Sequence, residues 1–195
     1  MKPRIVLSII LLVVCGALGL AARPRFDSVR FVAASAEMIR PGRPASALVD
    51  IMVTSWTSAQ NHRLLMRTLL ERGPNAFADL LCNFSPHGSF GVFASPDVTI
   101  RYAWQAVDRD KSTRIYLAAD APIFLTPRLW VDRVPPSEPL TFVELRLDQD
   151  GKGEGKLANV RQLSADEGRD VIELRDYSQL PVRLMRVERL GLLEH

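Results

Sequence analysis

The chain has 195 residues, with 25 Lys and Arg against 22 Asp and Glu, so its formal net charge is only +3. A nucleic-acid-binding domain needs clustered positive charge, and this near balance excludes nucleic acid as the partner. The length is sufficient for one domain with a sizeable hydrophobic core.

The first 22 residues have the pattern of a Sec signal peptide. Lys2 and Arg4 precede an uncharged apolar run over residues 5–22, and small residues near Ala21 favour cleavage there. The alternative is an uncleaved membrane anchor formed by residues 5–22, because the run is close to the length of about 20 residues that spans a bilayer. Lipid attachment at Cys15 is disfavoured by the bulky residue before it. We therefore expect a secreted or periplasmic protein, which touches the membrane only through this segment if it is uncleaved.

Residues 23–45 are rich in Arg, Pro, Ala and Ser, and we interpret them as a linker with one edge strand at Ser28–Ala34. Residues 46–190 form the single expected domain, and 191–195 a C-terminal tail. The domain opens with a predicted strand within Ala47–Trp56, which is apolar and partly β-branched.

A helical pair is predicted next. Thr57-Ser58-Ala59-Gln60 fits a capping box with Thr57 at the N-cap, and leucines follow at helical spacing until Gly73-Pro74. A second helix is expected from there to about Leu81. Cys82 follows this helix in an apolar context and is predicted to be a buried thiol. It has no intrachain disulfide partner if Cys15 leaves with the signal.

The rest of the chain is predicted to be mostly strands, so the expected fold class is α+β, with a mainly antiparallel sheet (a meander, barrel-like or sandwich-like) and the helical pair inserted after the first strands. The expected strands are Ser89–Phe93, Val98–Val107, Thr113–Ala119, Leu140–Asp148, Gly153–Leu163, Asp170–Asp176 and Val182–Glu188. Between them, Pro122–Pro139 is a Pro-rich loop that contains Trp130, and long loops in compact domains are often functional.

The segment LTFVELRLDQDGKGEGKLANV, residues 140–160, fits either a calcium loop or a β-hairpin. A calcium loop is disfavoured because Lys152 and Asn159 occupy two of the ligand positions. A hairpin with the three-residue loop Gln149-Asp150-Gly151 fits better, since Gly151 supplies the positive φ of a bulged turn.

The charges fix the hairpin register. The three-residue loop places opposite charges across from each other on one face and apolar residues with Gly153 and Gly155 on the other. The charged pairs are Asp148 with Lys152, Arg146 with Glu154 and Glu144 with Lys156. Gly153 and Gly155 have no side chains, so this part of the sheet surface is shallow, and we expect the helical pair to pack against it.

The chain resembles an uncharacterised family of secreted bacterial proteins. The resemblance covers about residues 47–190, and its motifs are Arg114–Ile123, Glu144–Asp148 with Gly151–Lys156, and Tyr177 with Pro181–Leu184, in the pattern ELRLDxDGKGEGK followed by Y-x3-PVRL. Relatives often carry Arg where Ala121 stands, and Glu-Asn-Tyr where Arg175-Asp176-Tyr177 stands. The resemblance implies the architecture and secretion, and it transfers no activity and no catalytic residue.

Candidate functional residues are few. Only His62, His87 and His195 are present and none share metal-ligand spacing, so no metal and no cofactor is expected. His62 is assigned to the polar side of the helix start. The catalytic candidates are His87 as a base with Ser85, Ser89 or Cys82 as nucleophile, and the binding candidates are Arg101, Tyr102, Trp104 and Trp130.

We expect a non-enzymatic domain that binds a ligand or an envelope protein, or that has a structural role. The alternative is a small hydrolase-like enzyme centred on His87. The alternative requires a pocket in which His87 hydrogen-bonds one of its candidate nucleophiles and has a carboxylate behind it.

Overall fold

The computed structural model describes residues 28–40, 43–45, 47–92, 96–123, 140–160, 163–174 and 181–191. The strands are β1 (Val29–Arg40), β2 (Arg43–Ala45), β3 (Leu48–Val53), β4 (Gly88–Val92), β5 (Val98–Val107), β6 (Thr113–Ala119), β7 (Leu140–Leu147), β8 (Lys152–Val160), β9 (Leu163–Asp166), β10 (Val171–Leu174) and β11 (Val182–Leu190). One helix, α1 (Ala59–Leu81), lies between β3 and β4. The expected signal peptide, most of the Pro-rich loop with Trp130, and Tyr177 lie outside the described residues.

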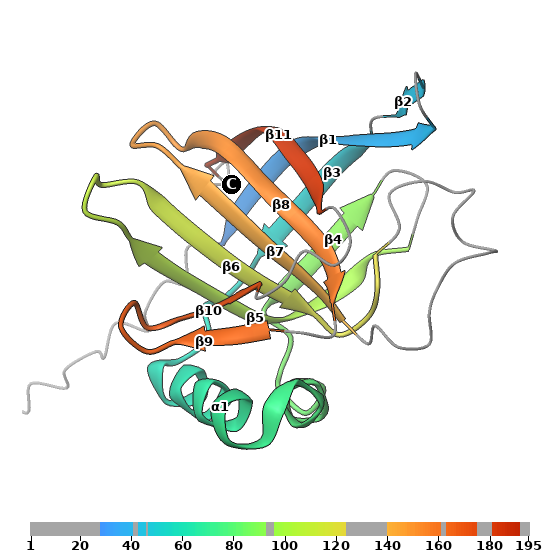
Figure 1. Cartoon of the computed structure of the whole chain (residues 1–195). Helices are drawn as coiled ribbons and strands as arrows, with labels where there is room; N and C mark the ends of the chain where they lie inside the picture. Colours follow the sequence, from blue (N-terminus) through green and yellow to red (C-terminus); the bar gives the residue numbers. More distant parts are fainter. Residues whose placement is uncertain are drawn as a thin grey trace, which may run out of the picture.

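Eight strands form a closed antiparallel barrel. The strand order is β11-β8-β7-β6-β5-β4-β3-β1, and β1 pairs with β11 to close the sheet (Figure 1). Neighbours in the barrel follow each other along the chain, apart from three insertions: β2 beside β1, α1 between β3 and β4, and the two-stranded β9–β10 hairpin between β8 and β11. The α+β class and the antiparallel sheet predicted from the sequence are therefore confirmed, and the sheet is a barrel.

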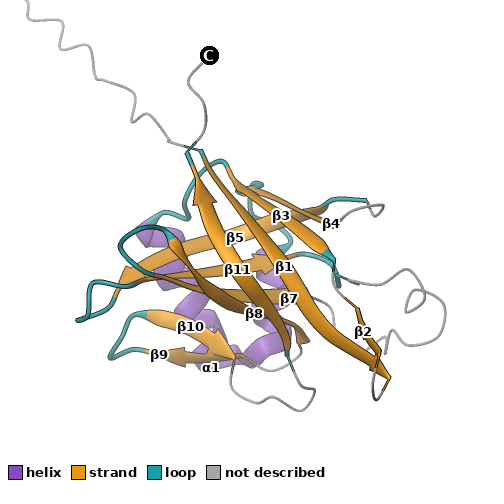
Figure 2. Ribbon diagram, turned by 90° about the horizontal axis from the view of Figure 1, so that it is seen from above, coloured by secondary structure: helices purple, strands orange, loops and turns teal. Residues whose placement is uncertain are grey.

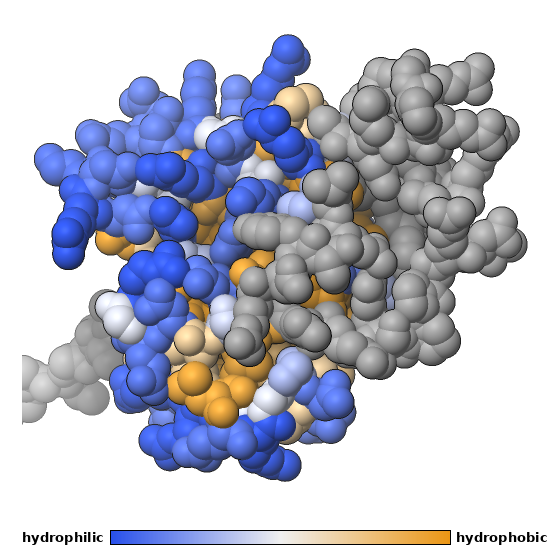
Figure 3. All heavy atoms as spheres, in the orientation of Figure 1, coloured by the Kyte–Doolittle hydropathy of each residue, from blue (hydrophilic) through white to orange (hydrophobic). Residues whose placement is uncertain are grey.

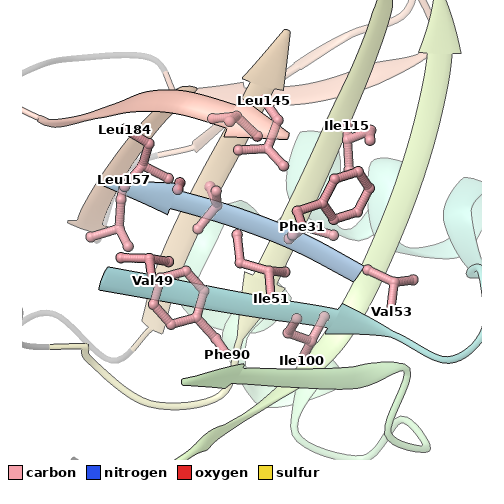
Figure 4. Packing of buried hydrophobic residues seen from close by; sticks show 14 of the residues in the cluster. Phe31, Val49, Ile51, Val53, Phe90, Ile100, Ile115, Leu145, Leu157 and Leu184 are labelled. Carbon is pink, nitrogen blue, oxygen red and sulfur yellow. The ribbon is translucent and has the colours of Figure 1, made fainter. Parts of the chain in front are cut away.

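Apolar side chains fill the barrel. Phe31, Ile51 and Leu145 are at most 1% exposed and meet inside it with side chains from the surrounding strands (Figure 4). An eight-stranded barrel has an interior just wide enough for side chains to fill. The barrel is thus closed and has a filled apolar interior.

A second apolar cluster lies outside the barrel. There α1 and the β9–β10 hairpin cover one part of the outer wall (Figure 2). Leu65 and Phe77 of α1 and Ile172 of the hairpin pack with Tyr102 and Phe142 of the wall, and all five side chains are fully buried. Where this cluster covers them, β5, β6 and β7 are therefore apolar on both faces, which explains the runs of buried residues in β6 and β7.

The structure contains one helix in the described residues, so the predicted helical pair is wrong. Gly73 leaves helical geometry, with φ 79° and ψ −178°, but Pro74 lies inside the helix. The fixed φ of proline suits the first turn of a helix, so the chain bends at Gly73 and resumes at once. The helix also starts one residue later than predicted, because Ser58 is the N-cap and its side chain accepts from the Asn61 N–H.

The β7–β8 hairpin has the register that the charge pattern predicts. Arg146 pairs with Glu154, Glu144 with Lys156 and Leu147 with Gly153. Gly151 has φ 74°. However, the helix does not pack on the glycines. A Cβ on Gly155 would lie 2.6 Å from Leu145 Cδ2, so the side of β8 on which this Cβ would stand faces the barrel core.

Candidate functional site

His87 precedes β4 and lies against the segment that joins β3 to α1. Its Nδ1 is 2.8 Å from the Oγ of Ser55. Its carbonyl oxygen accepts from the Thr54 N–H at 2.8 Å, and its own N–H donates to the carbonyl of Ile100 at 2.7 Å. Burial lowers the pKa of His87, which favours the neutral ring. This fixed serine–histidine pair is the arrangement that a general base needs, with Ser55 in the place of the nucleophile.

The three nucleophiles proposed from the sequence lie elsewhere. Cys82 and Ser85 are exposed and Ser89 is half-buried on β4. The prediction of a buried Cys82 thiol is wrong, because α1 ends at Leu81 and leaves the next side chain in solvent. Among the described residues, no hydrogen bond joins His87 to these three residues or to a carboxylate. The pairing with Ser55 was missed because Ser55 is 32 positions away in the chain.

The binding candidates on β5 belong to two environments, because Tyr102 and Trp104 share the outer apolar cluster and Arg101 is in an ion pair. Arg101 lies at a register shift of the β5–β6 pair, and its guanidinium donates to Asp120 and to the Phe84 carbonyl. Tyr102 is fully buried in the outer apolar cluster. Trp104 is half-buried, and its indole N–H donates to the carbonyl of Asp170 at 3.2 Å. They form no shared open surface, so the predicted aromatic and Arg cluster is not assembled by these three residues.

A buried histidine centre joins α1, β5 and the turn between β9 and β10. His62 is 0% exposed, with its Nδ1 3.0 Å from the Tyr102 hydroxyl and its Nε2 3.1 Å from Asp170 Oδ1. Its ring stacks on Trp104, with centroids 3.9 Å apart and planes 2° apart. We call these four residues the His62 latch. The assignment of His62 to the polar side of the helix is wrong.

A signal for His62 was present in the sequence. His62, Leu65, Met66 and Leu69 recur at positions i, i+3, i+4 and i+7, which is one face of a helix, and all four are buried. The partners of His62 come from residues 40 and 108 positions away, and no local pattern marks them.

A hollow of the outer wall lies on β6, β7, β8 and the start of β11. It is a groove of about 480 Å³. Its polar lining consists of Arg114, Tyr116, Glu144, Arg146, Glu154, Lys156 and Arg183. We call it the wall groove. Figure 3 shows this face of the molecule, with hydrophilic side chains gathered over the ends of β5–β8. The volume is in the range of small-molecule sites, roughly 300–1,000 Å³.

The electrostatics of the wall groove centre on Glu144. Glu144 is half-buried between its strand neighbours Tyr116 and Lys156. Burial raises the pKa of its carboxyl group, while the positive charge of Lys156 opposes the rise and Glu173 of β10 adds to it. A charged group that is partly desolvated interacts strongly with an incoming partner.

Two of the cations on the rim are in exposed ion pairs. Arg183 lies 3.1 Å from Glu154, with side chains 69% and 66% exposed, and Arg146 lies 2.6 Å from Asp110. Exposed ion pairs contribute only about 0–1 kcal/mol, so a ligand can replace these partners at little cost. The lining holds four basic and two acidic side chains, and Arg114 and Arg146 are paired with Asp108 and Asp110 beside it.

In the described residues, the fold and these sites define a closed antiparallel β-barrel with the helix α1, a charged groove on its outer wall and two histidine centres. Comparison with protein families, curated proteins and solved structures finds no match, so the resemblance to secreted bacterial proteins stays a prediction. Within the described part of the chain, no helix is long and apolar enough to cross a membrane. The same residues hold no group of three or more metal-ligating side chains.

Proposed function

We propose that the protein is a non-enzymatic binding domain of the cell envelope or exterior, and that it binds an anionic ligand or an acidic patch of a protein partner in the wall groove. The observation that carries this proposal is the group of four basic side chains around a half-buried carboxylate, on the wall of a closed barrel. Arg and Lys bind oxyanions by charge-assisted hydrogen bonds. The N-terminal signal pattern supports the location.

Glu144 gives the proposed site its selectivity. A carboxylate on the groove floor repels a bare anion but accepts a hydrogen bond from a hydroxyl or an ammonium group. The ligand we expect therefore carries both an oxyanion and a neighbouring donor. Sugar acids and acidic peptides have both groups, whereas sulfate at neutral pH is an oxyanion without a hydrogen-bond donor.

An NMR titration with glucuronate, an acidic tetrapeptide and sulfate tests the proposal. We expect shifts of backbone amides on β6, β7 and β8, larger for the first two probes. Reversing two charges with Lys156→Glu and Arg183→Glu weakens binding at least about tenfold. Arg67→Glu, on the exposed side of α1, is the matched control and leaves binding unchanged. Shifts that map elsewhere, or that survive both charge reversals, contradict the proposal.

The second candidate function is that of a small hydrolase at His87, with Ser55 as the nucleophile. The 2.8 Å contact between Ser55 and His87 favours it. The Ser55 oxygen would attack an ester carbonyl and pass its proton to His87, which returns it to the leaving alcohol, and water then hydrolyses the acyl-serine. A fluorophosphonate probe tests this: we expect covalent labelling of Ser55 that is lost in Ser55→Ala and in His87→Ala. Absence of labelling in the unmodified protein rejects the candidate.

A further inference from the structure

The His62 latch has a defined arrangement of protons. The carboxylate of Asp170 has no hydrogen to donate, so the hydrogen bond at His62 Nε2 requires that this nitrogen carries the proton. In the neutral ring Nδ1 is then an acceptor, and the hydroxyl of Tyr102 must be the donor. Every polar atom of the imidazole is satisfied in this state.

A second proton on His62 breaks this arrangement. Nδ1 becomes a donor, so the Tyr102 oxygen must accept and its own hydrogen loses its acceptor. Tyr102 is 0% exposed, and no other hydrogen-bond partner of its hydroxyl is present among the described residues. A buried polar hydrogen without a partner costs about 1–3 kcal/mol.

The charged groups around His62 shift its pKa in opposite directions. Burial lowers the pKa of His62, and Arg63 of the same helix adds to this, whereas Asp170 raises it. Burial is the larger effect. Beside Asp170, Arg169 is held by Asp166 and Glu173 of the same hairpin. On β5 and β6 the facing titratable groups are Tyr102 and Tyr116, whose pKa values burial raises, so both stay neutral.

Asp170 supplies polar contacts that hold the hairpin to the wall, beside the buried apolar side chains of Val171 and Ile172. Its side chain accepts from His62 and its main-chain carbonyl accepts from Trp104. The residue has φ 53°, in the left-handed region, so the turn is held in a conformation that non-glycine residues rarely adopt. The hairpin has four residues in each strand and forms a sheet separate from the barrel. A two-stranded hairpin is marginally stable without such support.

We propose that the His62 latch is a proton-operated release, in which protonation of His62 frees the β9–β10 hairpin from the outer wall while the barrel stays closed. The barrel ladder does not include β9 or β10, so its strand pairing survives the release. The inference does not depend on ligand binding in the wall groove. It assigns a proton-sensing role to His62.

Hydrogen exchange measured by mass spectrometry tests the release on the full chain. After correction for the intrinsic rate, opening of residues 163–174 should rise by up to about tenfold per pH unit below about pH 6.5, the ordinary pKa of histidine. The amides of β5, β6 and β7 should stay protected over the same range. Exchange of the hairpin that does not change with pH, or that rises together with exchange of the barrel, overturns the proposal.

Two variants and one control complete the test. His62→Asn removes the titrating ring, so the hairpin should exchange rapidly at every pH, whereas the control His87→Asn should keep the pH dependence. We expect Asp170→Asn to fold, since its side chain is 64% exposed and Asn accepts the left-handed conformation. It removes the charge that favours the protonated ring, so the pKa of His62 measured by NMR should fall further. An unchanged or higher pKa contradicts the assignment of Asp170 as the partner.

Discussion

The rings of His62 and Trp104 are stacked with their centroids 3.9 Å apart, although the two residues lie on the helix and on the barrel wall. Asp170 hydrogen-bonds both of them, through its side chain and its main chain. These contacts join α1, β5 and the turn between β9 and β10. It also places a titratable ring in the centre of the outer apolar cluster, where any unpaired polar atom is costly.

The first prediction concerns the hydroxyl of Tyr102. Tyr102→Phe keeps the ring in the apolar cluster but leaves Nδ1 of His62 without its donor. We expect a loss of about 1–3 kcal/mol in the free energy of unfolding, because the nitrogen is buried and no water reaches it. Urea denaturation followed by far-UV circular dichroism measures it. Stability equal to that of the unmodified protein would mean that this contact makes no net contribution.

The second prediction concerns the close approach of β7 and β8. A Cβ on Gly153 would lie 1.9 Å from the carbonyl oxygen of Arg146, so Gly153→Ala forces the two strands apart. We expect a loss of at least about 1–3 kcal/mol. Gly191→Ala is the control, since nothing lies within 4 Å of its added methyl group. Equal melting temperatures for both variants would contradict the close packing at Gly153.

Gly151 tests the same hairpin through its backbone. It has φ 74°, and an added Cβ would also approach the Cβ of Arg189 at 3.0 Å. Gly151→Val should therefore reduce the free energy of unfolding by more than about 1 kcal/mol, because a β-branched residue resists positive φ. Gly151→Asn is the matched variant, since Asn tolerates this conformation better. If Val and Asn have the same effect, the conformation of the turn does not determine the stability.

The extent to which the sequence predicts this fold depends on how local each signal is. The β7–β8 hairpin was predicted down to its register because opposite charges and glycines lie on two adjacent strands. β5 and β6 were also predicted at their observed bounds, from short apolar runs between turn residues. In contrast, closure of the barrel depends on β1 pairing with β11, and no local pattern encodes a contact between the two ends of the domain.

The functional sites, too, were predicted only where their sequence signals are local. His87 was identified from the sequence, but its partner Ser55 was not, because the pair depends on the antiparallel alignment of β3 and β4. The wall groove was also missed. Its charges were interpreted only as the solvent face of a hairpin, and the concave shape arises when β6 and β11 are placed on either side of it.

The fourth prediction tests the start of the helix. The structure places Ser58 at the N-cap, where its hydroxyl accepts from Asn61, whereas Thr57 accepts from the buried N–H of Ala103. Ser58→Ala should cost about 1 kcal/mol through fraying of the helix. Thr57→Val should cost about 1–3 kcal/mol, because it leaves a buried N–H on β5 unpaired. Hydrogen exchange separates the two effects: the first variant should loosen α1, and the second should expose the Ala103 amide.

The last prediction concerns acid stability at the β5–β6 turn. Asp110 accepts from the N–H and the hydroxyl of Ser112 and from Arg146, and these contacts lower its pKa from 3.8 to about 2. The unfolded chain therefore binds a proton more readily than the folded chain. The stabilisation from Asp110 is complete above pH 3.8 and is lost as the pH falls towards about 2. In Asp110→Asn, unfolding free energy should fall less steeply across this window, and Asp150→Asn, on the neighbouring exposed turn, is the control. If the slope is the same in both variants, Asp110 does not carry the acid dependence of this turn.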